Sequence, residues 1–528
     1  MRTLYNTLWS DPWIKVSDIL FKERELIPAY WIGFYDDGSE HDVPIKYPDI
    51  IYHSRWDVWK GIFPVEIEKT YSNYKLNIDF LNSIANYELQ AMTMMDRMDP
   101  DRHSFAFAER QRFFRNLLRK WLAVVDIYNI DLVIGDRIPH RPYDYALYLI
   151  CLYLKIPYLF LNITNLPNRL IWSYDISRIT DSVGLTYNKL LSQLQNKSIK
   201  EIIKRIDDDI IDNYLKKKND YNSAIPTYMV AHKKRQKRNS NIIFLGMNFL
   251  KSFLYINKDK TIYRRRNKTF IKDFCDIHPY AKRKNKKIEV SRYNALHYGY
   301  INYKAINYKN RLKKYYNLIA EKPDMSEKFI YFALHYQPEA TSNPSGDIFT
   351  DQYLAVEQIS ASLPSNYKIY IKEHKSQFLT ISEGHKSRFK HLYDDLMKIR
   401  NVVFIDLETN PFDLIDNSIA VATITGTAAW EAIVRKKPAI VFGLTWLEAF
   451  PGVLKINKKE DNDKIIKFVN NYKFNEKDLL TYLIAIQTLA PKTYSYMLSG
   501  KANVDEEICI KNLCNQVSIA LKELKNKL

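Results

Sequence analysis

The segment from residue 421 to residue 443 constrains the fold of this chain more than any other stretch. Residues 421–425 form a β-branched run that suits a buried parallel strand. Gly426 permits a tight turn, and the sequence then predicts a helix over 428–436 that ends before a proline. A second strand follows over 439–442. The segment therefore predicts a strand–helix–strand unit, whose two strands pair in parallel.

The start of the predicted helix also indicates a binding site. Thr425, Gly426 and Thr427 stand beside backbone N–H groups that have no acceptor within the helix, and such groups suit an anion. We expect Thr427 to cap the helix. Glu431 lies one turn further on, where its carboxylate could accept hydrogen bonds from a ribose. The alternative is an ordinary strand–helix–strand unit with a well-capped helix and no ligand.

Strands and helices alternate through the last third of the chain. The sequence predicts strands over 329–336, 368–373 and 402–406, separated by helices over 351–363, 385–399 and 411–417. Nearer the N-terminus, strands over 131–135 and 157–163 flank an apolar helix over 143–155. These patterns predict an α/β fold with two Rossmann-like domains that face a cleft, joined by helical material.

The length and composition agree with two globular domains. The chain has 528 residues, of which 46% are apolar, so it has material for two cores and is not disordered. We expect an N-terminal Rossmann-like domain over 1–190, a helical, basic insertion over 191–325, a C-terminal Rossmann-like domain over 326–500 and a final helix over 501–528.

Cysteine usage and hydropathy indicate a cytoplasmic protein. The four cysteines show neither a CxxC pair nor zinc-ligand spacing, so we expect reduced, packed thiols at Cys151, Cys275, Cys509 and Cys514. The first 20 residues lack the apolar run of a secretory signal. No window holds 18 uncharged apolar residues, so the sequence predicts no membrane-spanning helix.

Positive charge is concentrated in residues 231–290. This stretch holds 18 lysines and arginines against 4 acidic residues, an excess of 14 that leaves 5 of the net charge of +19 for the rest. Its basic clusters flank an apolar stretch over 242–256, which fits a helix on the anionic inner face of the membrane. The alternative is a solvated, lysine-rich insertion. Nucleic acid is not an expected partner, because no recognition motif accompanies the charge.

Polar residues follow each predicted strand of the C-terminal domain. Parallel strands bind ligands outside their carboxyl ends, so these residues should line one crevice. We expect the 425–427 turn and Glu431 to bind a nucleotide there together with His335, Gln337, Lys372, Glu373 and His374. Glu339, in the loop after the first of these strands, is a candidate for a charged role at the reacting sugar. No DxD-type pair follows a strand, so we expect no obligatory metal.

A second crevice is predicted after strand 131–135. His140 is a candidate general base near neutral pH, with Asp136 as the other candidate. Asp144, four residues after His140, could orient the imidazole or could cap the helix that follows, and the two roles are compatible. Asp207, Asp208 and Asp209 form a run that is more typical of a solvated helix face than of a site.

Several of these strings together resemble bacterial capsule and surface-polysaccharide biosynthesis proteins. They are residues 332–346, Leu363-Pro364, residues 369–374, residues 425–432 with Lys437-Pro438, and Pro139-His140. The resemblance covers about 125–175 and 325–455 and implies a GT-B fold with the donor nucleotide in the C-terminal domain. Related enzymes carry a His-Pro motif on the donor phosphate, whereas Lys375 follows His374 here.

The resemblance implies a glycosyltransferase of capsule or lipopolysaccharide biosynthesis. Relatives resemble transferases of sialic-, legionaminic-, pseudaminic- or Kdo-type ulosonic acids from CMP-linked donors, so we expect a CMP-linked sugar as substrate and no further cofactor. The expected acceptor is a glycan or a lipid-linked glycan at the membrane, to which residues 231–290 would bind peripherally. The alternatives are a transferase that uses a UDP-sugar, an enzyme similar to UDP-GlcNAc 2-epimerases, and a non-catalytic assembly protein docked on the membrane.

Overall fold

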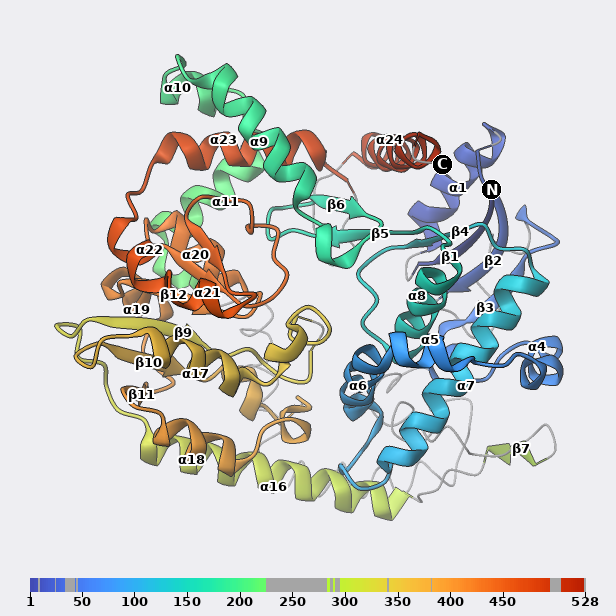
Figure 1. Ribbon diagram of the computed structural model, residues 1–528, viewed down its shortest axis with the longest axis horizontal. Helices are drawn as coiled ribbons and strands as arrows, with labels where there is room; N and C mark the ends of the chain where they lie inside the picture. Colours follow the sequence, from blue (N-terminus) through green and yellow to red (C-terminus); the bar gives the residue numbers. More distant parts are fainter. Residues whose placement is uncertain are drawn as a thin grey trace.

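Figure 1 shows the computed structural model of the chain. The structure describes residues 1–7, 10–23, 25–33, 43, 46–224, 283–284, 288–289, 295–339, 341–380, 382–493 and 505–526. Its described part is built on two six-stranded sheets, one on each side of the view in Figure 1.

The first sheet holds the N-terminal strands. Its order is β3 (Ile51–Ser54), β2 (Ile27–Gly33), β1 (Arg2–Asn6), β4 (Leu132–Gly135), β5 (Tyr158–Ile163) and β6 (Leu170–Ser173). All neighbouring strands pair in parallel except β5 and β6, which are antiparallel. The main helices of this half are α1 (Ser10–Lys22), α6 (Ala85–Met94), α7 (Phe107–Ile127) and α8 (Pro142–Leu154).

The second sheet is parallel throughout. Its order is β11 (Val402–Phe404), β10 (Lys368–Lys372), β9 (Phe329–Ala333), β12 (Ala420–Thr423), β13 (Ala439–Val441) and β14 (Val453–Lys455). In chain order both sheets therefore run 3-2-1-4-5-6, the strand order of a Rossmann fold. The α/β class with two Rossmann-like domains that the sequence predicts is confirmed.

Alternating strand residues fill the two faces of the second sheet. Phe329 and Tyr331 pack in a core shared with one face of the first sheet, whereas Ile330 and Phe332 pack on the opposite side, because successive side chains of a strand point to opposite faces. Helices α16 (Ala295–Ile319), α17 (Gln352–Ser362) and α18 (Lys390–Lys398) cover that opposite side. The shared core holds α19 (Pro411–Asn417), α20 (Thr427–Val434) and α23 (Glu476–Leu489), with α9 (Asp181–Leu194) and α11 (Asp208–Asn219) packed against α23 and α20.

The chain returns to its starting domain at the C-terminus. Helix α24 (Glu506–Lys525) packs against α1, and its Val517 shares a core with Tyr5 and Leu132 of the first sheet. The marked chain ends accordingly lie close together in Figure 1. The final helix predicted for residues 501–528 therefore packs on the N-terminal domain.

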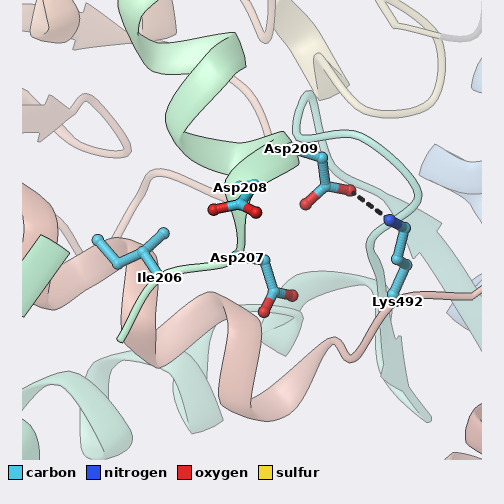
Figure 2. Close-up of a pocket in the computed structure, with 5 residues that line it drawn as sticks. All are labelled: Ile206, Asp207, Asp208, Asp209 and Lys492. Carbon is cyan, nitrogen blue, oxygen red and sulfur yellow. Dashed lines mark ion pairs between the residues drawn. The ribbon is translucent and has the colours of Figure 1, made fainter. Parts of the chain in front are cut away.

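The acidic run at 207–209 helps to hold this crossover in place. Figure 2 shows Asp207, Asp208 and Asp209 around a small pocket with Lys492. Asp209 pairs with Lys492 at 3.4 Å and with the fully buried Arg169 at 3.2 Å, and Asp207 also pairs with Arg169. Asp207 and Asp208 are exposed, as the prediction of a solvated face requires, while Asp209 is half-buried. Asp207 and Asp209 in addition supply the negative charge that the buried Arg169 guanidinium needs.

Element boundaries in the C-terminal domain match the predictions closely, with one larger difference. The helix predicted over 385–399 begins only at Lys390, since a short 3₁₀ turn, η7 (Gly384–Lys386), precedes it. In the N-terminal half the strands β1, β2 and β3 were not predicted.

Two further predictions concern compartment and membrane. Cys151, Cys509 and Cys514 are free and buried, as expected, while Cys275 lies outside the described residues. Among the described residues, no helix combines the length and the apolar character needed to cross a bilayer. The basic stretch 231–290 lies outside the described residues except for 283–284 and 288–289, which pair as two short strands, β7 (Arg283–Lys284) and β8 (Ile288–Glu289).

Candidate active site

Three central strands of the second sheet deliver the predicted donor residues to one edge. Strand β9 lies between β10 and β12, with Ala333 opposite Lys372 and Phe332 opposite Ala422. His335, His374 and Thr425 each come two residues beyond the end of one of these strands. The order of connections reverses between β9 and β12, and such a switch point leaves a crevice between the two loops.

His335 bridges the loops after β9 and β12. Its Nε2 accepts a hydrogen bond from the backbone N–H of Thr425 at 3.3 Å. A Cβ on Gly426 would lie 2.8 Å from the same nitrogen, so only glycine allows this approach. Burial, together with the charges of His374 and Arg388, lowers the pKa of His335 to about 3. The imidazole is therefore neutral near pH 7, as an acceptor at Nε2 must be.

His374 is the second neutral histidine of the edge. Its Nδ1 accepts the backbone N–H of Ser376 at 3.2 Å and so begins the 3₁₀ turn η6 (Lys375–Phe378). Burial lowers the pKa of His374 to about 4, although the neighbouring Glu373 favours the charged form. With Nδ1 accepting, the neutral ring carries its proton on Nε2, which makes that nitrogen a donor suited to a phosphate oxygen.

Helix α20 begins at this edge, one residue earlier than predicted. Its N-cap is Gly426, whose lack of a side chain leaves the first turn without a side-chain acceptor. The prediction that Thr427 caps the helix is wrong, since Thr427 is the first helical residue and is exposed. The hydroxyl of Thr425 instead donates to the carbonyl of Thr341 at 2.5 Å. The helix start is thus open for an outside acceptor.

Glu373 holds the edge from beneath. Its carboxylate accepts from Arg388 at 2.6 and 3.1 Å, from the Tyr393 hydroxyl at 2.8 Å and from the His374 amide at 2.8 Å. The side chains of Glu373 and Arg388 are both fully buried. Arg388 also donates to the His335 carbonyl at 2.8 Å. These contacts are those of a positioning residue, and a role in donor binding is untested.

Gln337 and Lys372 are also engaged by protein groups. The Gln337 side chain accepts from Arg388 at 2.8 Å and donates to the Thr350 carbonyl at 2.7 Å. Lys372 is buried and donates to the Leu407 carbonyl at 3.1 Å. Burial lowers the pKa of Lys372 to about 8. Both residues therefore fix the loops around the crevice.

Glu431 is buried on the first turns of α20 and faces helix α11. Its Oε1 accepts from Lys217 at 2.7 Å. Burial raises the pKa of Glu431, while Lys217 and then Arg435 oppose the rise. The predicted contact with a ribose is untested, and Lys217 was not among the residues that the sequence singled out.

The second predicted crevice follows β4 in the first sheet. His140 is buried there, and its Nδ1 lies 2.8 Å from the Ile138 carbonyl, to which it donates. The lone pair of the neutral ring is therefore on Nε2. Burial and the nearby Arg141, Arg97 and Arg137 hold the pKa of His140 well below its usual value. The ring thus has the protonation state of a base at neutral pH.

Asp144 caps helix α8 and does not orient the imidazole. Its Oδ1 accepts the backbone N–H groups of His140 at 2.9 Å and Arg141 at 2.6 Å. Of the two roles predicted for Asp144, the contacts are those of the helix cap, and the Ile138 carbonyl orients the ring. Burial raises the pKa of Asp144 to about 6. Asp136, the other candidate base, pairs with Arg137 at 3.0 Å.

Arg97 connects the two crevices. It lies in η2 (Met95–Met98) and donates to the His140 carbonyl at 2.9 Å, while its own carbonyl accepts from Lys386 of the second domain at 2.9 Å. Across the boundary is Glu339, which is exposed. Desolvation by the neighbouring protein raises the pKa of Glu339, and the Thr341 hydroxyl and Arg97 oppose that rise. The charge of Arg97 therefore acts on both His140 and Glu339.

The sequence patterns do not point to Arg97, Lys386 and Arg388. None of them follows a strand directly, and a lone basic residue in a helical or loop segment is usually solvated. For Arg388 a signal did exist in the buried Glu373, because a carboxylate after an apolar strand needs a cation. The sequence gives no distance between residues 373 and 388, so the pairing could not be inferred.

Comparison with protein families identifies the group to which the chain is related. Residues 210–482, just over half of the chain, match the model of the capsule polysaccharide biosynthesis proteins. The chain belongs to this family. The match includes every donor-side residue named above and the basic stretch, and it begins after the N-terminal crevice. No curated protein matches the chain.

Solved structures give distant likenesses. The chain is similar to KpsC from Thermosulfurimonas dismutans, described as a β-Kdo 2,4 transferase, at 16% identity over 35% of this chain and 55% of that one, with a TM-score of 0.22. It is also similar to the β-Kdo 2,7 transferase of the same KpsC, at 14% identity over 40% of this chain and 61% of that one, with a TM-score of 0.23. The UDP-GlcNAc 2-epimerase of Methanocaldococcus jannaschii gives 13% identity over 90% of this chain and 94% of that one, with a TM-score of 0.23. The chain spans less than two thirds of the two KpsC chains.

Proposed function

We propose that this protein is a glycosyltransferase of capsule polysaccharide biosynthesis that moves an ulosonic acid from a CMP-linked donor to a glycan or lipid-linked acceptor. The observation that carries the proposal is the meeting of His335, His374 and the open start of α20 at the switch point of the second sheet. The family membership of the chain supports the biosynthetic role.

The donor edge suits a leaving phosphate. The first amides of α20 and the positive end of its dipole attract an anion. His374 adds a neutral N–H donor from the neighbouring strand. As the bond between the anomeric carbon and the phosphate oxygen breaks, these fixed donors stabilise the charge that develops on the nucleotide. The proposed reaction needs no metal for that task.

The opposite crevice suits the acceptor hydroxyl. In the proposed step the acceptor oxygen bonds to the anomeric carbon and its proton passes to Nε2 of His140. The depressed pKa of His140 keeps the ring unprotonated but weakens it as a base. An anionic substrate beside it would raise that pKa and so strengthen the base in the filled site.

The arginines around His140 favour an acidic sugar. Arg97, Arg137 and Arg141 all lower the pKa of His140, so their fields overlap at the reacting centre. An ulosonic acid carries a carboxylate next to its anomeric carbon, and guanidinium groups are suited to bind it. A neutral sugar would leave this positive potential unmatched.

A nucleotide panel tests the donor site. Thermal unfolding of the full chain is followed with CMP, UDP and GDP, and a ligand present at 100 times its Kd should stabilise the fold by about 2.7 kcal/mol. We expect CMP to give the largest shift, and turnover of a CMP-linked ulosonic acid to persist in EDTA. Stabilisation by UDP alone, or conversion of a UDP-sugar without any acceptor, would contradict the proposal.

Peripheral attachment through residues 231–290 is part of the same proposal. Its support is the sequence alone: basic clusters that flank an apolar stretch. Sedimentation with vesicles rich in anionic lipid should decrease as salt rises. Equal binding to neutral vesicles at all salt concentrations is the opposing result.

A further inference from the structure

A large cavity lies outside the two crevices. It measures about 1000 Å³ and is formed by the segment 100–103 of the first domain, one side of α16, and His385 of the second domain. Helix α16 runs along the bottom of the molecule in Figure 1, beneath α18 and toward the lower end of α7. The cavity therefore spans the boundary between the domains, and the proposed reaction leaves it unused.

One stripe of α16 faces this cavity. Its members recur at intervals of three or four residues, which places them on one side of a helix. They are Tyr300, Lys304, Asn307, Arg311 and Lys314, and all of them line the cavity. From first to last they extend over about 21 Å at 1.5 Å per residue. The stripe is thus long enough for an extended ligand.

The lining is strongly cationic. Lys304, Arg311, Lys313 and Lys314 are exposed, and within the described part of the chain none of them forms an ion pair. The one acidic residue among the described lining residues is Asp101, whose carboxylate accepts from the amides of residues 103 and 104. Acidic side chains therefore do not balance the positive charge of the lining, and a bound anion would supply that balance.

Aromatic and amide side chains accompany the cations. Tyr300 is 56% and Tyr303 63% exposed. Two asparagines, Asn307 and Asn310, lie beside them. Tyrosine rings offer an apolar face with a polar tip, and amides bind hydroxyl groups, so the mixture suits sugar rings.

The opposite side of α16 holds the helix firmly against the donor domain. The Lys309 amine donates to the carbonyls of Leu379, Thr380 and Ser382 at 2.7, 2.9 and 2.6 Å. The Tyr316 hydroxyl accepts the amide of Glu373 at 3.0 Å, directly before His374. The stripe is therefore presented on a rigid element that contacts the donor edge.

The cavity wall continues toward His140. Arg102 donates to the carbonyls of Lys386 at 2.9 Å and Arg388 at 3.2 Å. Lys386 in turn donates to the carbonyl of Arg97. The guanidinium of Arg97 donates to the carbonyl of His140. A chain that lies along α16 could thus reach the crevice between the two domains.

We propose that this cavity binds the acceptor of the transfer reaction and that the acceptor is an anionic, carboxylate-bearing oligosaccharide. The identification of the ligand as the acceptor rests on the proposed function, whereas the binding of an anionic oligosaccharide in this cavity does not. The lining of tyrosine, asparagine and basic side chains is concave, and concave sites suit a glycan that can enter them. A membrane surface is flat, so it would contact a protruding face of the protein more readily than this cavity.

The test uses the full chain and a fluorescently labelled decamer of galacturonic acid, with a neutral dextran decamer as its counterpart. The triple variant Lys304→Glu/Arg311→Glu/Lys314→Glu reverses the stripe. We expect wild-type protein to bind the galacturonate decamer and not the dextran, and the triple variant to bind at least about tenfold more weakly. Added salt should weaken the wild-type complex.

The matched control is Lys467→Glu/Lys473→Glu/Lys511→Glu, which makes the same change in net charge at exposed lysines away from the cavity. It should bind within about twofold of wild type, since long-range charge effects are screened. Equal losses in both variants would show a net-charge effect and overturn the inference. Unchanged melting temperatures show that both variants remain folded.

Other outcomes separate this inference from the proposed function. Decamer binding without any response to a nucleotide supports the cavity and counts against the transferase. A nucleotide response without decamer binding does the reverse. Vesicles of phosphatidylglycerol and phosphatidylcholine provide the last arm, because stripe-dependent binding to them, with none to the decamer, assigns the stripe to the membrane and overturns the inference. A glycan carried on lipid is distinguished from free glycan by competition with the unlabelled decamer.

Discussion

The two sheets share one strand order, but the charges at their binding edges differ. At the edge of the second sheet, His335 and His374 are neutral, and Arg388, which donates to the His335 carbonyl, is paired with Glu373. At the edge of the first sheet, three arginines surround His140. The same topology thus provides a crevice of neutral donors and a crevice of positive charge.

The difference follows from what each crevice is proposed to hold. A nucleotide phosphate can be bound by helix amides and neutral N–H groups, which need no counterion. A base that must accept a proton near an acidic sugar needs cations that bind the sugar and keep the base unprotonated. Charge is therefore expected to be structural at the edge of the second sheet and functional at the edge of the first.

The largest effect is expected from Arg388→Met. The substitution leaves Glu373 buried without its cation, and removal of one member of a buried ion pair costs about 3–5 kcal/mol. Urea unfolding of the variant should show this loss of free energy. The added change Glu373→Gln should restore part of it, because the uncompensated charge is then removed.

Arg141→Met is the matched change in the other crevice. Arg141 donates to the Tyr143 hydroxyl at 3.2 Å, and no buried carboxylate depends on it alone. We expect a stability loss of about 1 kcal/mol or less, together with weaker binding of the acidic donor. Equal stability losses for the two variants would remove the distinction between structural and functional arginines.

The next effect separates His140 from His374. His140→Gln removes the proposed base, so turnover should fall about a hundredfold while nucleotide binding stays unchanged. His374→Gln should instead weaken nucleotide binding, since its proposed partner is the phosphate. Turnover assays and nucleotide titrations measure the two effects, with the exposed His391→Gln as a silent control. A His140→Gln enzyme with normal turnover would falsify the assignment of the base.

Sequence patterns predicted the second domain far better than the first. Strands β9 and β12 are uninterrupted apolar or β-branched runs, and β10 has three such residues between two lysines, so their positions were predicted to within three residues. Strand β2 contains Pro28, and β1 begins with Arg2 and ends with Asn6. Such residues are rare in central strands. They are accommodated here because partner strands and helices bury the remaining side chains.

The candidate site was predicted as a set of loops and not as a set of contacts. Strand ends gave His335, His374, Thr425 and His140, since parallel strands present their following loops at one edge. The sequence could not tell that Gly426 rather than Thr427 is the N-cap, because both are acceptable there. It also could not reveal Arg97, whose role depends on how the two domains meet.

The contributions of His374 and Asp144 to the pH dependence of stability should have opposite signs. The pKa of His374 is lowered to about 4, so the unfolded chain binds the proton more tightly as pH falls from 6.5 toward 4, and stability is lost. The pKa of Asp144 is raised to about 6, so its contribution is present below 3.8 and is lost as pH rises through 6.

Single variants separate these two terms. Relative to wild type, His374→Gln should gain about 2 kcal/mol of unfolding free energy between pH 7 and pH 4, a value reduced for the partial exposure of the ring. Asp144→Asn should gain about 2 kcal/mol in the opposite direction, between pH 4 and pH 7. Urea unfolding across the range measures both, and parallel profiles for the two variants would contradict the opposite signs.

The effect expected from Gly426→Ala is smaller than that of the pH-dependent variants, because this change alters shape alone at the donor edge. The new Cβ would lie 2.8 Å from Nε2 of His335, so the turn that begins α20 must shift by a few tenths of an ångström. We expect the Kd for the nucleotide to rise about tenfold, or about 1.4 kcal/mol, since the first amides of α20 would no longer meet the phosphate in register with His374. Gly184→Ala in α9 is the control, because its Cβ meets only the methyl carbon of Ala449 at 3.3 Å, far in sequence from either crevice. Titration calorimetry with the nucleotide should leave Gly184→Ala at the wild-type Kd, and the same result for Gly426→Ala would mean that the helix start does not bind the phosphate.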